Sequence, residues 1–215
     1  MSPARPRQAR TTPGEPERVE LPAHLPLVRI YDSHFYRDGA SFRHVGPHVR
    51  GRWDHHLPDP DTGAPIPNGE RGVLYVTITL RCAVAEVFGD DRRVSPSSAQ
   101  RLAVLEVDRP LDLVDTRGLA AVQLGVAAGA LRARDRDLTQ RIARELYAQT
   151  DADGLLYEGW QTGETCVCLW ERVADRVEVL DDRGLIDDPY VALDLAVIAD
   201  MLFYDRPGIP RNVDE

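Results

Sequence analysis

The sequence contains no lysine, so all 26 of its basic residues are arginine. An anion bound by a cationic side chain must therefore be bound by guanidinium groups, which contact phosphate oxygens in pairs. The 35 acidic residues outnumber the arginines, and the formal net charge is −9. These values argue against direct nucleic-acid binding as a function, because phosphate contact needs a basic face.

Cysteine and long apolar runs are also scarce. There are three cysteines, Cys82, Cys166 and Cys168, and no C-x-x-C pair. The odd count and the spacing argue against a disulfide framework and a zinc site, so we expect buried, reduced thiols. No stretch approaches the roughly 18 apolar residues of a membrane span, and the opening "MSPARPRQAR" lacks the apolar core of a secretory signal. The expected location is therefore the cytoplasm, with no membrane contact.

Familiar catalytic motifs are missing too. The chain has no G-x-G-x-x-G after a strand, no P-loop, no G-x-S-x-G and no H-E-x-x-H. All six histidines lie between His24 and His56, but none forms a convincing helical pair, and we expect no metal site.

The length of 215 residues favours a single domain. Residues 1–20 mix Pro, Arg, Glu and Thr with almost no large apolar residues, which predicts a disordered leader. We expect the domain over 21–205 and a flexible tail over 206–215. The sequence leaves open whether the protein forms a homo-oligomer.

Strand patterns outnumber helix patterns along the domain. The expected strands cover 25–33, 73–80, 101–108, 111–115, 154–157, 165–173 and 176–181. The expected helices cover 81–88, 137–150 and a last segment opened by Asp188 and Pro189. A long loop is expected over 37–72. The strands follow one another too closely for repeated βαβ units, so we predict a single α+β domain of mixed or antiparallel sheets with flanking helices.

One acidic residue stands out in the segment "GVLYVTITLRCAVAEVFGD". Helical periodicity places Val84, Val87 and Phe88 toward the core and Glu86 roughly opposite. The residues around Glu86 are small, which fits either an ordinary surface glutamate or a carboxylate in a cleft that its neighbours keep open.

Two arginines and a tyrosine also merit attention. Arg29 lies inside an apolar strand, and Arg52 follows Gly51, where the backbone can turn tightly. Each arginine taken alone fits a structural ion pair better than a ligand contact, and Tyr75 fits the core.

Taken in order, these residues resemble the RES-domain family. The resemblance rests on Arg29 in a first strand, "GRWD" in a loop, "GVLYVTITLRCAVAEVF", and "DGLLYEGWQTGETCVCLWERV". It covers roughly residues 25–175, and its specific part is the order of Arg, Gly-Arg-aromatic, a strand Tyr, and a Glu eleven residues beyond that Tyr. Known members include bacterial toxins of toxin–antitoxin pairs that consume NAD, and the family fold resembles that of the ADP-ribosyltransferase toxins.

The resemblance implies roles for individual residues. NAD would be the substrate and not a bound cofactor, and cleavage of its nicotinamide–ribose bond develops cationic character at the ribose. Glu86 would stabilise that cation and hold a ribose hydroxyl, with Arg29 as a second catalytic residue. Arg29 and Arg52 would bind the diphosphate and ribose side. Tyr75 would pack against a ring with its hydroxyl in the site, and His55 would at most adjust the charge beside Arg52.

The resemblance leaves three functions open. The first is NAD cleavage with inorganic phosphate or water as acceptor, as the toxin of a pair whose separate Xre-like antitoxin covers the pocket. The second is transfer of ADP-ribose to a protein. The third is a degenerate RES fold that binds a nucleotide or partner without turnover, because Gly159 stands where many members have the family's serine.

Overall fold

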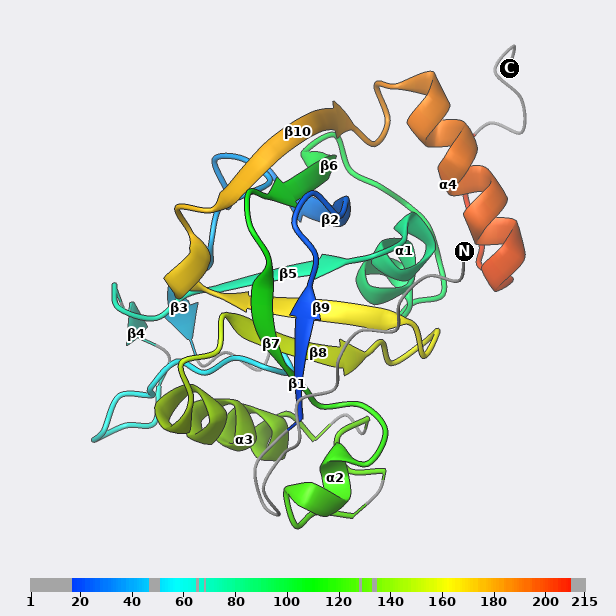
Figure 1. Cartoon of the computed structure of the whole chain (residues 1–215). Coiled ribbons are helices and arrows are strands. Elements are labelled where there is room, and N and C mark those ends of the chain that lie inside the picture. The colour runs from blue at the N-terminus through cyan, green and yellow to red at the C-terminus, as the bar shows by residue number, and fades with distance from the viewer. Residues whose placement is uncertain are drawn as a thin grey trace, which may run out of the picture.

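The computed structural model describes residues 17–46, 51–64, 66–67, 69–127, 129–132 and 135–209. Its centre is an eight-stranded sheet in the order β1-β7-β8-β9-β5-β2-β6-β10 (Figure 1). These strands are β1 (Arg18–Leu21), β2 (Leu27–Asp32), β5 (Val73–Thr77), β6 (Gln100–Val107), β7 (Leu111–Asp115), β8 (Gly154–Glu158), β9 (Thr165–Trp170) and β10 (Val177–Gly184). Neighbours pair antiparallel except β7 and β8, which are parallel. The predicted mixed sheet is thus confirmed.

The remaining elements are short or helical. They are a separate two-stranded sheet of β3 (Val45–Gly46) and β4 (Ile66–Pro67), the helices α1 (Leu80–Phe88), α2 (Ala120–Gln123), α3 (Arg136–Gln149) and α4 (Pro189–Leu202), and a 3₁₀ turn at Glu171–Val173. The loop predicted over 37–72 contains both strands of this small sheet. Among the described residues, no helix is long and apolar enough to cross a membrane.

The sheet curls around its own core. Leu113 of β7 and Leu105 of β6 belong to one buried cluster, although four strands separate β7 from β6 in the sheet order. Only a curled sheet brings such strands together. The face that points away from this core is covered at two places, by α3 through Ile142 and Leu146 over β8 and β9, and by α1 packed with α4 over β2 (Figure 1). The three cysteines are buried free thiols, as predicted.

Capping side chains set the ends of two helices. The Thr79 hydroxyl accepts a hydrogen bond from the Cys82 amide, so α1 begins at Leu80 and the strand predicted over 73–80 ends at Thr77. The Asp188 carboxylate accepts from two amides at the start of α4, and Pro189 occupies the first turn, as predicted.

The edge strand β1 begins inside the segment predicted as a leader. Arg18 binds the Asp112 carboxylate at 2.6 Å, which joins β1 to its partner β7. Residues 1–16 of the predicted leader lie outside the described residues. In the predicted tail, Arg206 binds the Asp200 carboxylate, and residues 210–215 lie outside the described residues.

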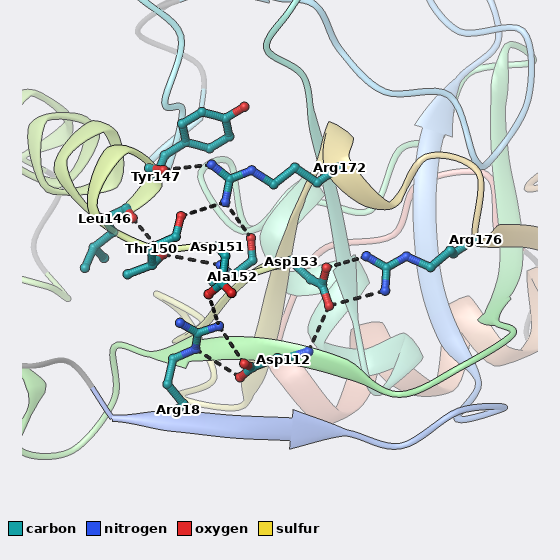
Figure 2. Close-up of polar contacts among 10 residues, drawn as sticks. All are labelled: Arg18, Asp112, Leu146, Tyr147, Thr150, Asp151, Ala152, Asp153, Arg172 and Arg176. Carbon is teal, nitrogen blue, oxygen red and sulfur yellow. Dashed lines mark hydrogen bonds and ion pairs between the residues drawn. The ribbon is translucent and has the colours of Figure 1, made fainter. Parts of the chain in front are cut away.

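Three arginines contact the end of α3, the turn that follows it before β8, and the neighbouring strand β7 (Figure 2). Arg18 contacts Asp112, and Arg176 binds the Asp153 carboxylate in the turn before β8. Arg172 donates to backbone carbonyls where α3 ends, those of Tyr147, Thr150 and Ala152. Carbonyls without a helical partner are thereby satisfied by a guanidinium group.

Candidate active site

Two neighbouring cavities share Glu86 as a wall residue. The first is also lined by Arg52, Asp90, Arg136 and Trp160, among others. The second is lined by Arg29, Tyr75 and Tyr157 together with apolar side chains of β2, β5 and α1. Four of the five predicted site residues, Arg29, Arg52, Tyr75 and Glu86, therefore line one continuous region around the Glu86 carboxylate.

The second cavity lies at a break in the sheet. Strands β2 and β5 pair at one position, Val28 opposite Thr77, whereas β2 and β6 pair along the whole strand. The two strands therefore diverge beyond that pair. Arg29 on β2 and Tyr75 on β5 both reach the space that opens between them.

Glu86 is open to solvent but enclosed by the cleft walls. Its Oε1 accepts a hydrogen bond from the Trp160 amide at 2.9 Å. Burial raises the pKa of the Glu86 carboxyl above its usual value, and the positive charge of Arg52 and the Trp160 amide partly oppose that shift. The carboxylate is thus set against a guanidinium group in a partly desolvated cleft.

Helix α1 packs against other elements on two of its sides and leaves the side with Glu86 exposed. Val84 and Phe88 are buried against α4, as predicted, but Val87 is 41% exposed and lines the second cavity. The prediction that Val87 faces the core is wrong because α1 packs on two sides, through Val84 toward α4 and through Cys82 toward β9. The exposed strip left between them carries Glu86 and Val87.

Gly159 leaves space for the same carboxylate. A Cβ atom at position 159 would lie 3.0 Å from Glu86 Oε1, 3.2 Å from the Cys166 sulfur and 3.3 Å from the Cys82 sulfur. Such contacts are tighter than ordinary van der Waals packing, so a serine here would require Glu86 or a thiol to move. Gly159 is thus matched to the packing around Glu86.

Arg52 is held above an aromatic ring. Its Nη2 donates to the Glu158 carbonyl at 2.6 Å, and its guanidinium carbon lies 5.1 Å from the centroid of the Tyr157 ring. Among the described residues no carboxylate forms an ion pair with Arg52, so its positive charge is available to an anion in the first cavity.

Arg29 is buried, with 7% of its surface exposed. Its Nη1 donates to the Gly39 and Ser41 carbonyls, both at 2.7 Å, and its guanidinium lies over the Tyr36 ring. Burial lowers the pKa of Arg29 to about 10, which still leaves the group charged at neutral pH. Within the described part of the chain, no carboxylate makes an ion pair with it.

Tyr75 and His55 differ from their predicted placement. The Tyr75 ring lines the second cavity, but its hydroxyl donates to Asp54 and accepts from the Trp53 amide. The structure does not bring His55 to the cleft. Its ring is fully buried, stacks on Tyr147 at 4.3 Å and bonds to Glu171, because the loop turns inward directly after Arg52.

Sequence reasoning missed Arg136. It is the first residue of α3, directly after the capping residue Asp135, and its side chain lines the first cavity with Arg52. The helix was predicted from residue 137, which left Arg136 in a charged run typical of a solvated surface. Its distance along the chain from Arg52 gives no local signal that the two guanidinium groups share a cavity.

Comparison with known proteins identifies the family. A family model described as the RES domain matches residues 26–194, which is most of the chain. The chain belongs to the RES-domain family. A relative of this RES domain is "Probable toxin y4kH" of Sinorhizobium fredii (strain NBRC 101917 / NGR234), 27% identical over 86 residues, which are 40% of this chain and 68% of the relative.

A solved structure shares the fold of this RES domain. A chain in the crystal structure of the M. tuberculosis MbcT-MbcA toxin-antitoxin complex superposes with a TM-score of 0.54 at 15% identity, covering 86% of this chain and 92% of that chain. The likeness bears out the predicted class, a single α+β domain with a mixed sheet.

Proposed function

We propose that this RES domain is the toxin of a toxin–antitoxin pair and cleaves the nicotinamide–ribose bond of NAD. The observation that carries the proposal is the position of Glu86, between a cavity with Arg52 and Arg136 and a cavity with Arg29 and Tyr75. Such an arrangement suits a dinucleotide, with guanidinium groups for its diphosphate and a carboxylate near its ribose.

The reaction follows from these charges. The bond between ribose C1′ and the nicotinamide nitrogen breaks, and its electron pair leaves with nicotinamide. Positive charge develops at C1′ and the ring oxygen, where the Glu86 carboxylate stabilises it. An oxygen of phosphate or water then bonds to C1′; attacking water also loses a proton to solvent. We place this reaction in the cytoplasm.

The test follows nicotinamide release from NAD by the purified protein, with and without inorganic phosphate. Glu86→Gln is the matched variant, because a glutamine oxygen can still accept from the Trp160 amide while the negative charge is gone. We expect release by the wild type and a loss of at least about 100-fold in the variant. Equal release by both proteins, or none by either, would remove the proposal.

The same experiment with labelled NAD identifies the acceptor. Product that appears only when phosphate is present indicates phosphorolysis, and product that forms equally without it indicates hydrolysis. Label that stays on a macromolecule supports ADP-ribosyl transfer instead. Tight binding of an NAD analogue together with no product would support a RES fold that binds without turnover.

We further propose a separate Xre-like antitoxin that covers this cleft. The solved complex pairs a toxin with an antitoxin. At the cleft of this chain, Val87 and Trp160 are 41% and 44% exposed, which offers apolar contact to a covering protein. The neighbouring gene should encode that protein. Its co-expression should abolish nicotinamide release and growth inhibition; an active complex would contradict the proposed coverage.

A further inference from the structure

The backbone on both sides of Arg52 is held by side chains from other elements. On one side, the Gly51 carbonyl accepts a hydrogen bond from Gln140 Nε2 of α3 at 2.8 Å. On the other side, the Trp53 amide donates to the Tyr75 hydroxyl of β5 at 2.9 Å. Arg52 therefore lies between two long-range hydrogen bonds, one to a helix and one to a strand.

A buried carboxylate fixes the direction of the Tyr75 hydroxyl. Its single proton is donated to Asp54 Oδ1 at 2.8 Å, and Asp54, which is fully buried, also accepts from Arg43. With its proton committed, the hydroxyl presents lone pairs to the Trp53 amide. Tyr75 is thus oriented to accept from the loop, and its proton is not available to a ligand.

The close packing of Gly51 shows how tightly the loop lies on the Tyr75 hydroxyl and the Asp54 carboxylate. A Cβ atom at position 51 would come within 2.0 Å of Asp54 Oδ1 and 2.6 Å of the Tyr75 hydroxyl oxygen. A side chain at that position would displace the loop from the carboxylate and hydroxyl that hold it. Position 51 is therefore a glycine because these two groups lie too close for a Cβ atom.

We propose that the Tyr75 hydroxyl, Asp54 and Gln140 are positioning residues that hold Arg52 toward the Glu86 cavity. This inference rests on the proposed cleavage of NAD. The ring and the hydroxyl of Tyr75 then have separate roles: the ring lines the second cavity, and the hydroxyl supports the loop. A shift of the loop by about 1 Å would misplace the Arg52 guanidinium relative to an anion in the cavity.

The first test is Tyr75→Phe, which keeps the ring and removes the hydroxyl. We expect the KM for NAD to rise about ten-fold, toward that of Arg52→Ala, while kcat at its optimal pH changes less than about three-fold. The double variant Arg52→Ala/Tyr75→Phe should be no worse than Arg52→Ala alone, because both changes remove the same contact. Additive losses would overturn the inference.

A pH profile adds a readout that simple loss of stability does not move. The charge of Arg52 lowers the pKa of the Glu86 carboxyl. In Tyr75→Phe and in Arg52→Ala, the acidic limb of kcat/KM should therefore move to higher pH. An unchanged limb in Tyr75→Phe, beside a shifted one in Arg52→Ala, would count against the positioning role.

A second variant and a control address folding. Gln140→Met removes the donor to Gly51 at similar volume and should raise the KM in the same direction. Tyr31→Phe is the matched control, because that hydroxyl also donates to a carboxylate, Asp182 of β10, at 2.6 Å, outside the loop that carries Arg52, and phenylalanine keeps the ring beside Arg29. It should leave the KM unchanged; a KM rise equal to that of Tyr75→Phe would overturn the inference.

Hydrogen exchange of the Trp53 amide tests the loop support without NAD. The amide should be protected in the wild type and in Tyr31→Phe, and exchange at least about ten-fold faster in Tyr75→Phe. Retained protection in Tyr75→Phe overturns the inference even if the protein cleaves NAD. Lost protection supports the loop contact even if nicotinamide release fails and the proposed function falls.

Discussion

At the scale of single residues, the direction of the Glu86 pKa shift predicts that its carboxylate destabilises the folded state. Burial raises its pKa above the usual value, so the folded protein binds the Glu86 proton more tightly than the unfolded chain does. Stability must then fall as the pH rises through the interval between the unfolded and the folded pKa. A carboxyl group in a structural ion pair would shift the other way, so the raised pKa of Glu86 agrees with the catalytic role proposed for it.

Glu86→Gln should therefore raise the melting temperature at neutral pH while it abolishes NAD cleavage. The gain should vanish below about pH 4, where glutamate is protonated in both states. Thermal unfolding of both proteins at pH 7.5 and at pH 4 measures this, with Glu178→Gln on the exposed face of β10 as control. An equal melting temperature at neutral pH would contradict the desolvated state of Glu86.

Arg52→Ala should weaken NAD use without unfolding the protein. Loss of a charge-assisted contact to a diphosphate costs about 1.5–3 kcal/mol, which is roughly a ten- to hundred-fold rise in KM. His55→Ala should show the opposite pattern, because His55 is buried against Tyr147 and Glu171: a lower melting temperature and a nearly unchanged KM. Arg183→Ala, an exposed arginine on β10, is the neutral control. A KM effect confined to His55→Ala would contradict the role given to Arg52.

The order of residues along the chain predicted part of this site and missed the rest for physical reasons. Arg29 and Glu86 lie on elements whose patterns are visible locally, a strand and a helix. The placement of His55 failed because the direction of a loop depends on distant partners, here Glu171. Arg136 was missed because only folding brings the start of α3 beside Arg52.

At the scale of elements, α3 both supports the site and depends on a distant arginine. Its start carries Arg136 and Gln140, and its end is capped by Arg172, which donates to three carbonyls (Figure 2). The helix is therefore fixed at the end remote from the cleft by a residue that follows β9.

Arg172→Ala should destabilise the fold by about 1.5–3 kcal/mol, because buried carbonyls lose a charged donor. Urea unfolding measures the loss, with Arg109→Ala on the exposed turn after β6 as control. The KM for NAD should stay within about two-fold of the wild type while the protein remains folded. A large KM change at full folding would mean that the end of α3 affects the cleft directly.

Periodicity predicted most elements but not how they pair. In runs such as "RLAVLEVD" and "VALDLAVIADML", the spacing of the apolar residues alone indicates a strand or a helix. Strand β1 does not, since two of its four residues are charged and its pairing depends on Asp112, far along the chain. The parallel contact of β7 with β8 likewise depends on α3 filling the connection between them.

At the scale of the whole molecule, Glu171 joins segments that are distant in sequence. It accepts from His55 in the loop after Arg52, from Tyr147 of α3 and from the Gly72 amide before β5. Burial alone would raise the pKa of Glu171, but these hydrogen bonds outweigh it and lower the pKa to about 2. Its stabilising contribution is thus present above the usual glutamate pKa and lost as the pH falls toward 2.

Glu171→Gln should lower the free energy of unfolding at pH 7 by about 1.5–3 kcal/mol and flatten its pH dependence between about 4.5 and 2. Chemical denaturation across this pH range measures both effects. Glu106→Gln, at the partly exposed pair with His24, provides the comparison and should leave the acid slope in place. If the free energy of unfolding fell with pH equally in the wild type and in Glu171→Gln, acid unfolding would start at another group.

The single pairing of Val28 with Thr77 gives the molecule a mechanical joint. The strands on one side of this pair, β1, β7, β8, β9 and β5, are well paired with one another, and so are β2, β6 and β10 on the other side. Bending should therefore concentrate where these two groups meet. Arg29 stands on one side of the joint and Tyr75 on the other. A ligand of the proposed site would contact both groups of strands, and binding should therefore reduce bending at the Val28–Thr77 pair.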